Sequence, residues 1–299
     1  MISVRHPHSF YLRSCIGSSN RYRYKTMFSG DREAAQIFAL EELVDEWSNM
    51  RILLINPNTS ESFTKKIQTI ADKFALPTTQ ALAVNPASGP RSIECIYDEL
   101  LSSPGTLETA LKHLDDCDAF VIACYSDHPS VYALREITDK PVLGIAEASM
   151  LIACMLGHKF SVVTTNREWE PLLLDAVQHY GLAARCASVR STGMPVLALE
   201  SASSEETYQM ILTASRRALE QDGAEVICLG CAGMTGLDKQ LEADLNVPVI
   251  DGVTGAIKLL EGLVGYGLRT SKRLAYSQPN YKELVGYPAV FSSSYKKPA

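Results

Sequence analysis

The feature of this sequence that most constrains its fold is a segment that recurs 107 residues further along the chain. The first copy, DAFVIACYSDHPSVYALREITDKPVLGIAEAS, resembles AEVICLGCAGMTGLDKQLEADLNVPVIDGVTGA in the second half. Aligning the two places Cys124 on Cys231 and Pro141 on Pro248, each with an offset of 107. Each copy has the order apolar run, cysteine, helical segment, proline, apolar run and small-residue turn. We therefore expect a duplicated unit.

Apolar runs alternate with helical segments from Met50 onward. Runs rich in Val, Ile and Leu have the length of fully buried parallel strands, and they cover 51–56, 118–124, 140–145, 159–165, 224–231 and 247–251. Helical patterns separate them at 61–74, 105–116, 130–138, 168–180, 204–221 and 235–244. This alternation predicts an α/β fold, with parallel-rich sheets flanked by helices.

The repeat divides the chain into two pseudo-symmetric lobes, with predicted limits at 50–155 and 156–270. RILLINPNTS at the start of the first lobe matches KFSVVTTNRE near the start of the second. Ligands in such folds bind outside the carboxyl ends of the strands. If the lobes face one another, Cys124 and Cys231 lie on opposite sides of a shared cleft, where we expect the active site.

The two ends of the chain differ from the lobes in composition. Residues 1–49 form an N-terminal extension, whose first 27 residues carry arginine, lysine and serine but no acidic residue. This composition is typical of a mitochondrial transit peptide, and the alternative is a disordered tail or a segment upstream of the real start. Residues 33–47 have the spacing of a short amphipathic helix. Residues 271–299, rich in Tyr, Pro, Ser and Lys, predict an extended tail.

Composition argues against several classes of partner. The formal net charge is -6 and no long basic run occurs, so we expect no nucleic-acid partner. No stretch reaches the roughly 18 uninterrupted apolar residues of a membrane-spanning helix, so we expect no membrane partner. A small-molecule substrate is the remaining expectation. We expect a cytoplasmic protein, or a mitochondrial one if residues 1–27 direct import.

The eight cysteines lack the regular spacing of a disulfide scaffold, so we expect reduced thiols. Cys228 and Cys231 form a CxxC, but no second pair with zinc-finger spacing accompanies it, and we expect no metal site. Free cysteine usually acts as a small buried apolar residue. We expect this role for Cys95, Cys117, Cys154, Cys186 and Cys228.

Cys124 and Cys231 differ from the other cysteines because each ends a strand and precedes a turn and a helix. A thiolate there can accept backbone N–H groups and lies near the positive end of a helix dipole, so we expect a lowered pKa. Two opposed thiols without a histidine base indicate proton transfer rather than hydrolysis. A stereocentre next to a carbonyl can lose its proton to one sulfur and regain one from the other, which inverts the centre without a metal or an organic cofactor.

The enolate that forms in such a reaction needs hydrogen-bond donors. The N–H groups after each cysteine are candidates, which include those of Ala232 and Gly233, with Ser126 and Thr165 nearby. Asn56 in INPNT is a candidate for binding a substrate amide or carbonyl group, and fixing the turn is the alternative.

Asp127 and His128 form an apparent catalytic pair after the first of these cysteines. An Asp at a strand-to-helix turn is more often a helix cap, and adjacent residues do not ordinarily orient each other. We therefore do not expect His128 to be catalytic.

Six ordered segments resemble the hydantoin and allantoin racemases of the aspartate/glutamate racemase superfamily. They are LLINPNTS at 53–60, GPRSIECIYDE at 89–99, CYSDHPSVYALREI at 124–137, VLGIAEAS at 142–149, FSVVTT at 160–165 and LGCAGM at 229–234. The resemblance covers about residues 50–275 and includes both cysteines. Many relatives have a glycine or another small residue between the first cysteine and the Asp-Pro that follows. This chain departs from them because His128 intervenes before Pro129, and this leaves the substrate preference open.

The resemblance implies a two-lobed α/β fold, cofactor-independent two-base chemistry at Cys124 and Cys231, and a homo-oligomer. It also implies that Ile93 and Tyr97, in the loop after GPRS, line the pocket for the substrate's substituent, with packing as the alternative. The implied reaction is racemisation of a 5-substituted hydantoin or of allantoin, a step of purine or nitrogen catabolism. The alternatives are a racemase or isomerase of an amino acid or maleate, and a non-catalytic ligand-binding or redox-sensing relative.

Overall fold

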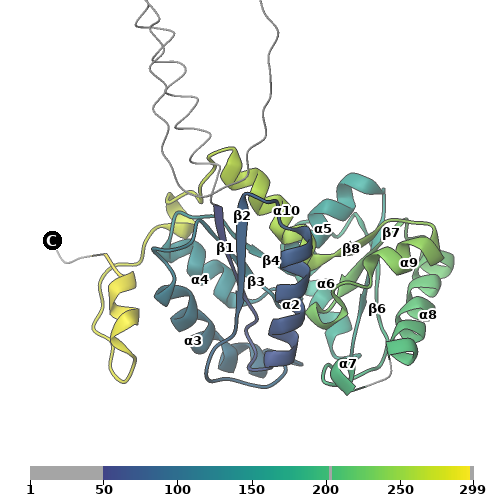
Figure 1. Cartoon of the computed structure of the whole chain (residues 1–299), viewed down its shortest axis with the longest axis horizontal. Coiled ribbons are helices and arrows are strands. Elements are labelled where there is room, and N and C mark those ends of the chain that lie inside the picture. Colours follow the sequence, from purple (N-terminus) through teal and green to yellow (C-terminus); the bar gives the residue numbers. More distant parts are fainter. Residues whose placement is uncertain (1–49, 202–203, 297–299) are drawn as a thin grey trace, which may run out of the picture. The chain divides into compact units, whose positions relative to one another are not determined.

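Two parallel four-stranded sheets with helices on both faces make up the fold in this computed structural model, which describes residues 50–201 and 204–296 (Figure 1). The first sheet has the strand order β2-β1-β3-β4, and the second has the order β6-β5-β7-β8. Every neighbouring pair is parallel. The two sheets have the same strand order, with β5 to β8 in the places of β1 to β4. The predicted α/β fold with two pseudo-symmetric lobes is confirmed.

The elements follow the chain in two similar series. The strands are β1 (Met50–Ile55), β2 (Thr79–Val84), β3 (Ala119–Ile122), β4 (Val142–Gly144), β5 (Phe160–Thr164), β6 (Cys186–Ser191), β7 (Val226–Gly230) and β8 (Val249–Asp251). The α-helices are α2 (Glu61–Phe74), α3 (Ile96–Lys112), α4 (Pro129–Ile137), α5 (Ile145–Leu156), α6 (Trp169–His179), α7 (Ala198–Ser201), α8 (Ser204–Asp222), α9 (Asp238–Leu245) and α10 (Gly252–Gly265). Short 3-10 helices are η1 (Ala232–Met234), η2 (Leu274–Tyr276) and η3 (Ala289–Ser294).

All six predicted strands are present, whereas β2 and β6 were not predicted. Both lie at the edge of their sheet, and most of their residues are partly exposed. The central strands, such as β3 and β5, are buried along their whole length. Partly exposed strands such as β2 and β6 have no continuous apolar run, whereas the other two edge strands, β4 and β8, are mostly buried and were predicted.

Helices α5 and α10 were also not predicted, because their sequences read as small-residue turns after a strand. Both helices are apolar on most sides, so they lack the polar stripe that marks a surface helix. Helix α3 begins at Ile96 and contains Pro104 in its interior, whereas we expected a helix that starts at residue 105.

Alternate residues of the central strands face two different cores. Leu53 and Ile55 of β1 pack with residues of α3 and α4, while Ile52 and Leu54 belong to a second core. That second core also contains residues of α2, α5, α6 and α10, and it includes Val162 of β5 from the other sheet. The two lobes therefore share one apolar core, which follows from the two-residue period of a strand.

Helices α5 and α10 each contact both sheets. α5 contacts β5, β7 and β8 of the second sheet, and α10 contacts β1, β3 and β4 of the first. Their first residues, Ile145 and Gly252, are again 107 positions apart, and they touch. A Cβ atom on Gly252 would lie 2.8 Å from the carbonyl oxygen of Ile145, so the close approach of the two helix starts requires glycine at this position.

The segment after α10 lies against the first lobe. η2 contacts α4 and η3 contacts α3. The Lys272 ammonium group donates hydrogen bonds to the carbonyl oxygens of Arg135 (2.8 Å) and Glu136 (2.6 Å), at the C-terminal end of α4. A cation at this end satisfies free carbonyl groups and interacts favourably with the helix dipole.

The predictions for residues 1–49 concern a segment outside the described residues, and so does the end of the predicted tail, residues 297–299. Within the described part of the chain, no helix combines the length and the apolar character that crossing a bilayer requires.

Replacing Gly252 with alanine tests the contact between the helix starts. The added methyl group would collide with the backbone of Ile145, so we expect Gly252→Ala to lower the free energy of unfolding by about 1–3 kcal/mol. The midpoint of urea unfolding measures the change. Gly262→Ala on the same helix is the matched control, because its Cβ would have no neighbour within 4 Å. That variant should be neutral or more stable by up to about 1 kcal/mol, and equal effects of the two substitutions would contradict the account.

Candidate active site

A cavity lies at the carboxyl ends of β1, β3, β5 and β7, where both lobes contribute to its wall. The cavity is narrow: about 440 Å³ of space, open solvent included, is free of protein atoms there. The first lobe contributes Asn56, Asn58, Phe63, Ile93, Ala123, Cys124 and Tyr125. The second lobe contributes Thr165, Trp169, Val196, Gly230, Cys231, Ala232 and Gly233. The cavity thus has the position expected for a ligand site in a parallel α/β fold.

Cys124 follows the last residues of β3 and lines the cavity. The Ser126 hydroxyl group donates a hydrogen bond to its sulfur at 3.4 Å. Burial raises the pKa of the Cys124 thiol far above its ordinary value, and the nearby Glu99 carboxyl group raises this pKa further. The hydrogen bond from Ser126 acts in the opposite direction but is the smaller effect.

Cys231 occupies the equivalent position after β7 and caps the 3-10 helix η1. The Gly233 N–H group donates a hydrogen bond to its sulfur at 3.4 Å. Burial raises the pKa of the Cys231 thiol to about 11, while the Gly233 amide and the Lys66 ammonium group favour the thiolate.

The expected lowering of both cysteine pKa values was wrong. No α-helix begins directly after either cysteine, since α4 starts at Pro129 and α9 starts at Asp238. The helix dipole therefore contributes little, because its effect is confined to the first turn. Loss of water around the sulfur outweighs the hydrogen bonds that the thiolate would accept.

The predicted polar residues Asn56 and Thr165 both line the cavity. In the described structure, the hydrogen bonds of the Asn56 side chain use its Nδ2, which donates to Asn58 Oδ1 (2.9 Å), Ser60 O (3.2 Å) and Thr64 Oγ1 (3.1 Å). Asn56 therefore fixes the turn after β1, and it presents a buried polar side chain to the cavity as well. Thr165 Oγ1 donates to Asn166 Oδ1 at 3.1 Å.

The remaining predicted residues differ in where they lie. Ile93, Ala232 and Gly233 line the cavity, whereas Ser126 is buried behind Cys124. Tyr97 is not part of the lining: it lies in the first turn of α3, with 68% of its surface exposed. The prediction that Tyr97 is in a loop failed because the helix starts before Pro104.

His128 is the N-cap of α4, a role that we had expected of Asp127. Its Nδ1 accepts a hydrogen bond from the Ser130 N–H group at 3.2 Å, and its Nε2 lies 3.0 Å from the Ser102 hydroxyl group. The side chain is buried, and this burial lowers the pKa of His128 to about 4. Asp127 instead contacts Tyr132 and His179. His128 is therefore neutral and holds the turn after Cys124.

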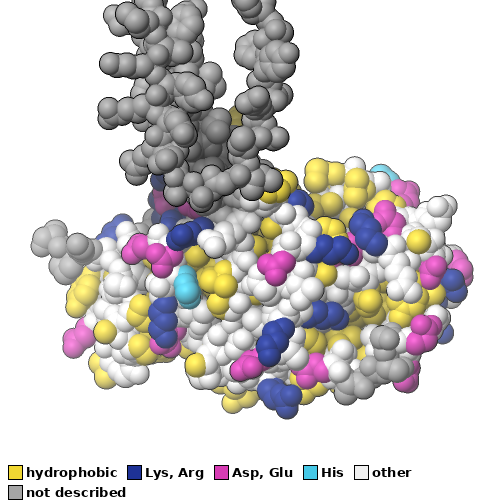
Figure 2. Space-filling view, in the orientation of Figure 1, with side chains coloured by type: hydrophobic (Ala, Val, Ile, Leu, Met, Phe, Trp, Pro, Cys, Tyr) yellow, Lys and Arg dark blue, Asp and Glu magenta, His cyan; other side chains and the backbone are white. Residues whose placement is uncertain are grey.

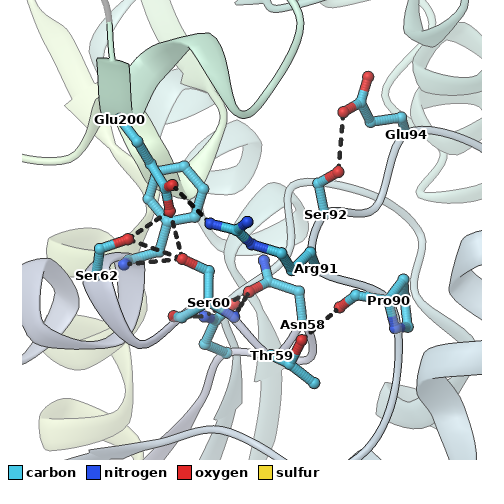
Figure 3. A network of polar contacts seen from close by, with 11 residues as sticks. Asn58, Thr59, Ser60, Ser62, Pro90, Arg91, Ser92, Glu94 and Glu200 are labelled. Atoms are coloured by element: carbon cyan, nitrogen blue, oxygen red, sulfur yellow. Dashed lines mark hydrogen bonds and ion pairs between the residues drawn. The ribbon is translucent and has the colours of Figure 1, made fainter.

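A polar network connects the two lobes at the rim of the cavity (Figure 3). Glu200 of α7 accepts hydrogen bonds from the hydroxyl groups of Ser60 and Ser62 at the start of α2. Arg91 lies 3.6 Å from the same carboxylate group. Figure 3 shows these side chains converging on Glu200 from the first lobe. Val196, shortly before α7, lines the cavity, so this segment covers part of the site.

Several residues of the site were not predicted from the sequence. Trp169, Phe63 and Val196 form apolar parts of the cavity wall, and apolar side chains of this kind resemble ordinary core residues. Glu99 acts on the Cys124 thiol and Lys66 acts on the Cys231 thiol. Both are charged residues within helices, and the sequence gives no sign that such residues are partly or fully buried. The only available signal for Lys66 was its position one turn after Phe63 on the buried side of α2.

The other cysteines lie apart from this site. Cys228 is buried in the shared core, where its thiol donates to the Ser149 carbonyl oxygen at 3.7 Å, and Cys117 is also buried. Cys95 is exposed, which corrects the expectation of a buried role. Cys154 and Cys186 are partly buried. Among residues 50–201 and 204–296, no three His, Cys, Asp or Glu side chains are grouped so that they could hold a metal ion.

Comparison with known proteins identifies close relatives. The family model described as Asp/Glu/Hydantoin racemase matches residues 52–260. The chain is 47% identical to a hydantoin racemase of Pseudomonas sp. (strain NS671) over 238 residues, which span 79% of this chain and 95% of the relative.

Solved structures give the same result. An allantoin racemase from Klebsiella pneumoniae is 41% identical, with a TM-score of 0.78, over 83% of this chain and 99% of that protein. An allantoin racemase from Pseudomonas fluorescens is 40% identical, with a TM-score of 0.77, over 79% of this chain and 100% of that protein. The resemblance carried by the six sequence segments is confirmed, and the chain belongs to the Asp/Glu/Hydantoin racemase family.

Proposed function

We propose that this protein racemises 5-substituted hydantoins, allantoin among them, by proton transfer between Cys124 and Cys231. The observation that carries the proposal is that equivalent ends of β3 and β7 contribute one thiol each to a single cavity. The hydantoin racemase and the allantoin racemases among its relatives support this substrate class.

The lining of the cavity favours a neutral substrate. In the described structure the cavity wall is made of apolar, aromatic, small and uncharged polar side chains, and it contains no Lys, Arg, Asp or Glu. An amino-acid zwitterion or the maleate dianion would lose its hydration there without an opposite charge to replace it. A hydantoin ring is neutral and offers amide N–H and C=O groups, so it loses less on entering. This argues for the cyclic ureides over the alternative substrates.

The proposed reaction needs one sulfur as thiolate and the other as thiol. The thiolate removes the proton from C5, and the electron pair of the C–H bond moves into the neighbouring carbonyl group. The thiol on the opposite face then gives its proton to C5, which inverts the centre. Each cysteine acts as base in one direction and as acid in the other.

Donors for the developing enolate oxygen lie next to both sulfurs. Tyr125 and Ala232 directly follow the two cysteines and line the cavity. Within the described residues, the N–H groups of both make no hydrogen bond to a protein acceptor. These amides support the expectation that backbone donors after each cysteine bind the oxygen, because fixed donors stabilise the charge that develops there.

We also propose that the protein forms a homo-oligomer, as the resemblance implies. Four large apolar side chains on the first turns of α3 are at least half exposed: Ile96, Tyr97, Leu100 and Leu101. On the face shown in Figure 2, hydrophobic side chains form patches between acidic and basic ones. Exposed apolar surface of this kind supports an interaction with another protein copy.

Replacing each cysteine singly tests the two-base proposal. We expect Cys124→Ser and Cys231→Ser each to lower the racemisation rate of pure hydantoin or allantoin enantiomers by about 10²- to 10⁴-fold, because serine is a much weaker acid than cysteine. Loss of optical rotation measures the rate. Cys95→Ser is the matched control, since this thiol is exposed and does not line the cavity. Full activity in both active-site variants would exclude the mechanism, and turnover of glutamate or maleate alone would exclude the substrate class.

The raised thiol pKa values predict an alkaline pH dependence. The pKa of Cys231 is raised to about 11 and that of Cys124 is also raised, so few molecules carry a thiolate at neutral pH. Below the pKa, the thiolate fraction grows about tenfold for each pH unit. We therefore expect kcat/KM to rise steadily from neutral pH into the alkaline range. Initial rates in a buffer series, corrected for racemisation without protein, measure this, and a maximum at or below neutral pH would contradict it.

A further inference from the structure

We propose that the two thiols are electrostatically unequal in the resting protein, with Glu99 holding Cys124 as the neutral thiol and Lys66 favouring the thiolate of Cys231. Both charged residues are then positioning residues, which decide which sulfur starts as the base. The inference rests on the proposed two-base function and deepens it.

Glu99 is a buried carboxyl group behind the first thiol. It lies in the first turn of α3, it is only 8% exposed, and its Oε1 has no hydrogen-bond partner among the described residues. Ser126 is near both groups: its hydroxyl group donates to Cys124 Sγ at 3.4 Å, and it acts to lower the pKa of Glu99. Burial raises the pKa of Glu99, and the nearby Asp127 charge adds to this effect.

The carboxyl group opposes ionisation of Cys124. In its charged form, Glu99 places a negative charge near the Cys124 sulfur. A second negative charge on Cys124 is then repelled by the first. Apart from Ser126, the groups that act on this sulfur are Glu99 and Cys231, and both disfavour its thiolate.

Lys66 has the opposite effect on the second thiol. It projects from α2 of the first lobe, and its Nζ donates to the Gly233 carbonyl oxygen at 2.5 Å. The N–H group of the same glycine donates to Cys231 Sγ, so the ammonium charge is held close to this sulfur by the other lobe. Burial lowers the pKa of Lys66, while Cys231 and Asp251 counteract the lowering.

The polar and charged groups around Cys231, taken together, favour its thiolate and oppose the larger effect of burial. The amide groups of Gly233 and Met234 and the charge of Lys66 lower the pKa of Cys231, and the carboxylate of Glu94 raises it by less than Lys66 lowers it. Cys231 thus has a cation and two amide donors, whereas Cys124 has a carboxyl group and one hydroxyl donor.

This difference assigns the first step of the reaction. When one of the two thiols ionises, the thiolate forms preferentially on Cys231, which accepts a C5 proton while the Cys124 thiol supplies one. After product leaves, Cys231 is the thiol and Cys124 the thiolate, a form that Glu99 makes unfavourable. Proton exchange with water then returns the negative charge from Cys124 to Cys231.

Alkylation of the two thiols tests the inference without any substrate. The full-length protein is treated with iodoacetamide at fixed pH, and peptide mass spectrometry follows the rates at Cys124 and Cys231 separately. We expect Cys231 to react faster. Glu99→Gln should raise the rate at Cys124 about tenfold and leave Cys231 unchanged, and Lys66→Gln should lower the rate at Cys231 about tenfold. Comparing each site with itself removes differences in access of the reagent.

Two matched controls lie on the same helices. Glu108→Gln removes a carboxylate of α3 that pairs with Lys112 on the surface, and Lys65→Gln removes the exposed neighbour of Lys66. Neither should change either rate. Lys66 is only partly buried, so the Lys66→Gln variant keeps the inference falsifiable even if Glu99→Gln does not fold.

An unchanged Cys231 rate in Lys66→Gln, or an unchanged Cys124 rate in folded Glu99→Gln, would overturn the inference. Because the assay uses no substrate, a protein that shows the predicted rates but racemises nothing would refute the proposed function alone.

Discussion

The contact between the first residues of α5 and α10 is the constraint on which the rest of the structure depends. Gly252 lies against the backbone of Ile145, and this brings together the starts of two helices that have equivalent positions in the two lobes. Each of these helices packs on the sheet of the other lobe, so neither lobe has a complete core by itself. The shared core holds the carboxyl ends of β3 and β7 at one cavity, with one cysteine at each end.

Burial then determines the chemistry that the two thiols can perform. Loss of water raises the pKa of both, which makes a thiolate scarce at neutral pH but also makes it a stronger base toward carbon. A wall of uncharged side chains surrounds both sulfurs, and in the proposed function the same wall selects against charged substrates. The charged groups that affect the sulfurs, among them Glu99 and Lys66, do not line the cavity.

Much of this fold could be predicted from the sequence, because central parallel strands are continuous apolar runs and the 107-residue offset relates one half to the other. The same offset identified Cys124 and Cys231 as a pair. The strands β2 and β6 are partly exposed, so they lack a continuous apolar run. The helices α5 and α10 are apolar on most sides, so they lack the polar stripe of a surface helix.

The electrostatic character of the site could not be predicted, because it depends on depth of burial rather than on residue type. Cys124 and Cys231 follow strands as expected. The predicted decrease in their pKa was wrong, because the cavity wall excludes water and raises both pKa values. Lys66 and Glu99 come from helices far from the cysteines in sequence, and only the folded chain brings them to the sulfurs. His128 has an ordinary structural role, since it caps α4.

The most direct test of the two-base account is the distribution of deuterium between substrate and product. A single hydantoin enantiomer is incubated with the protein in heavy water, the reaction is stopped early, and deuterium at C5 is measured in each separated enantiomer. Because one sulfur removes the original proton and the other supplies one from solvent, the account predicts deuterium in the product and protium in the remaining substrate. Deuterium in both enantiomers from the start, or a product that keeps its original hydrogen, would contradict it.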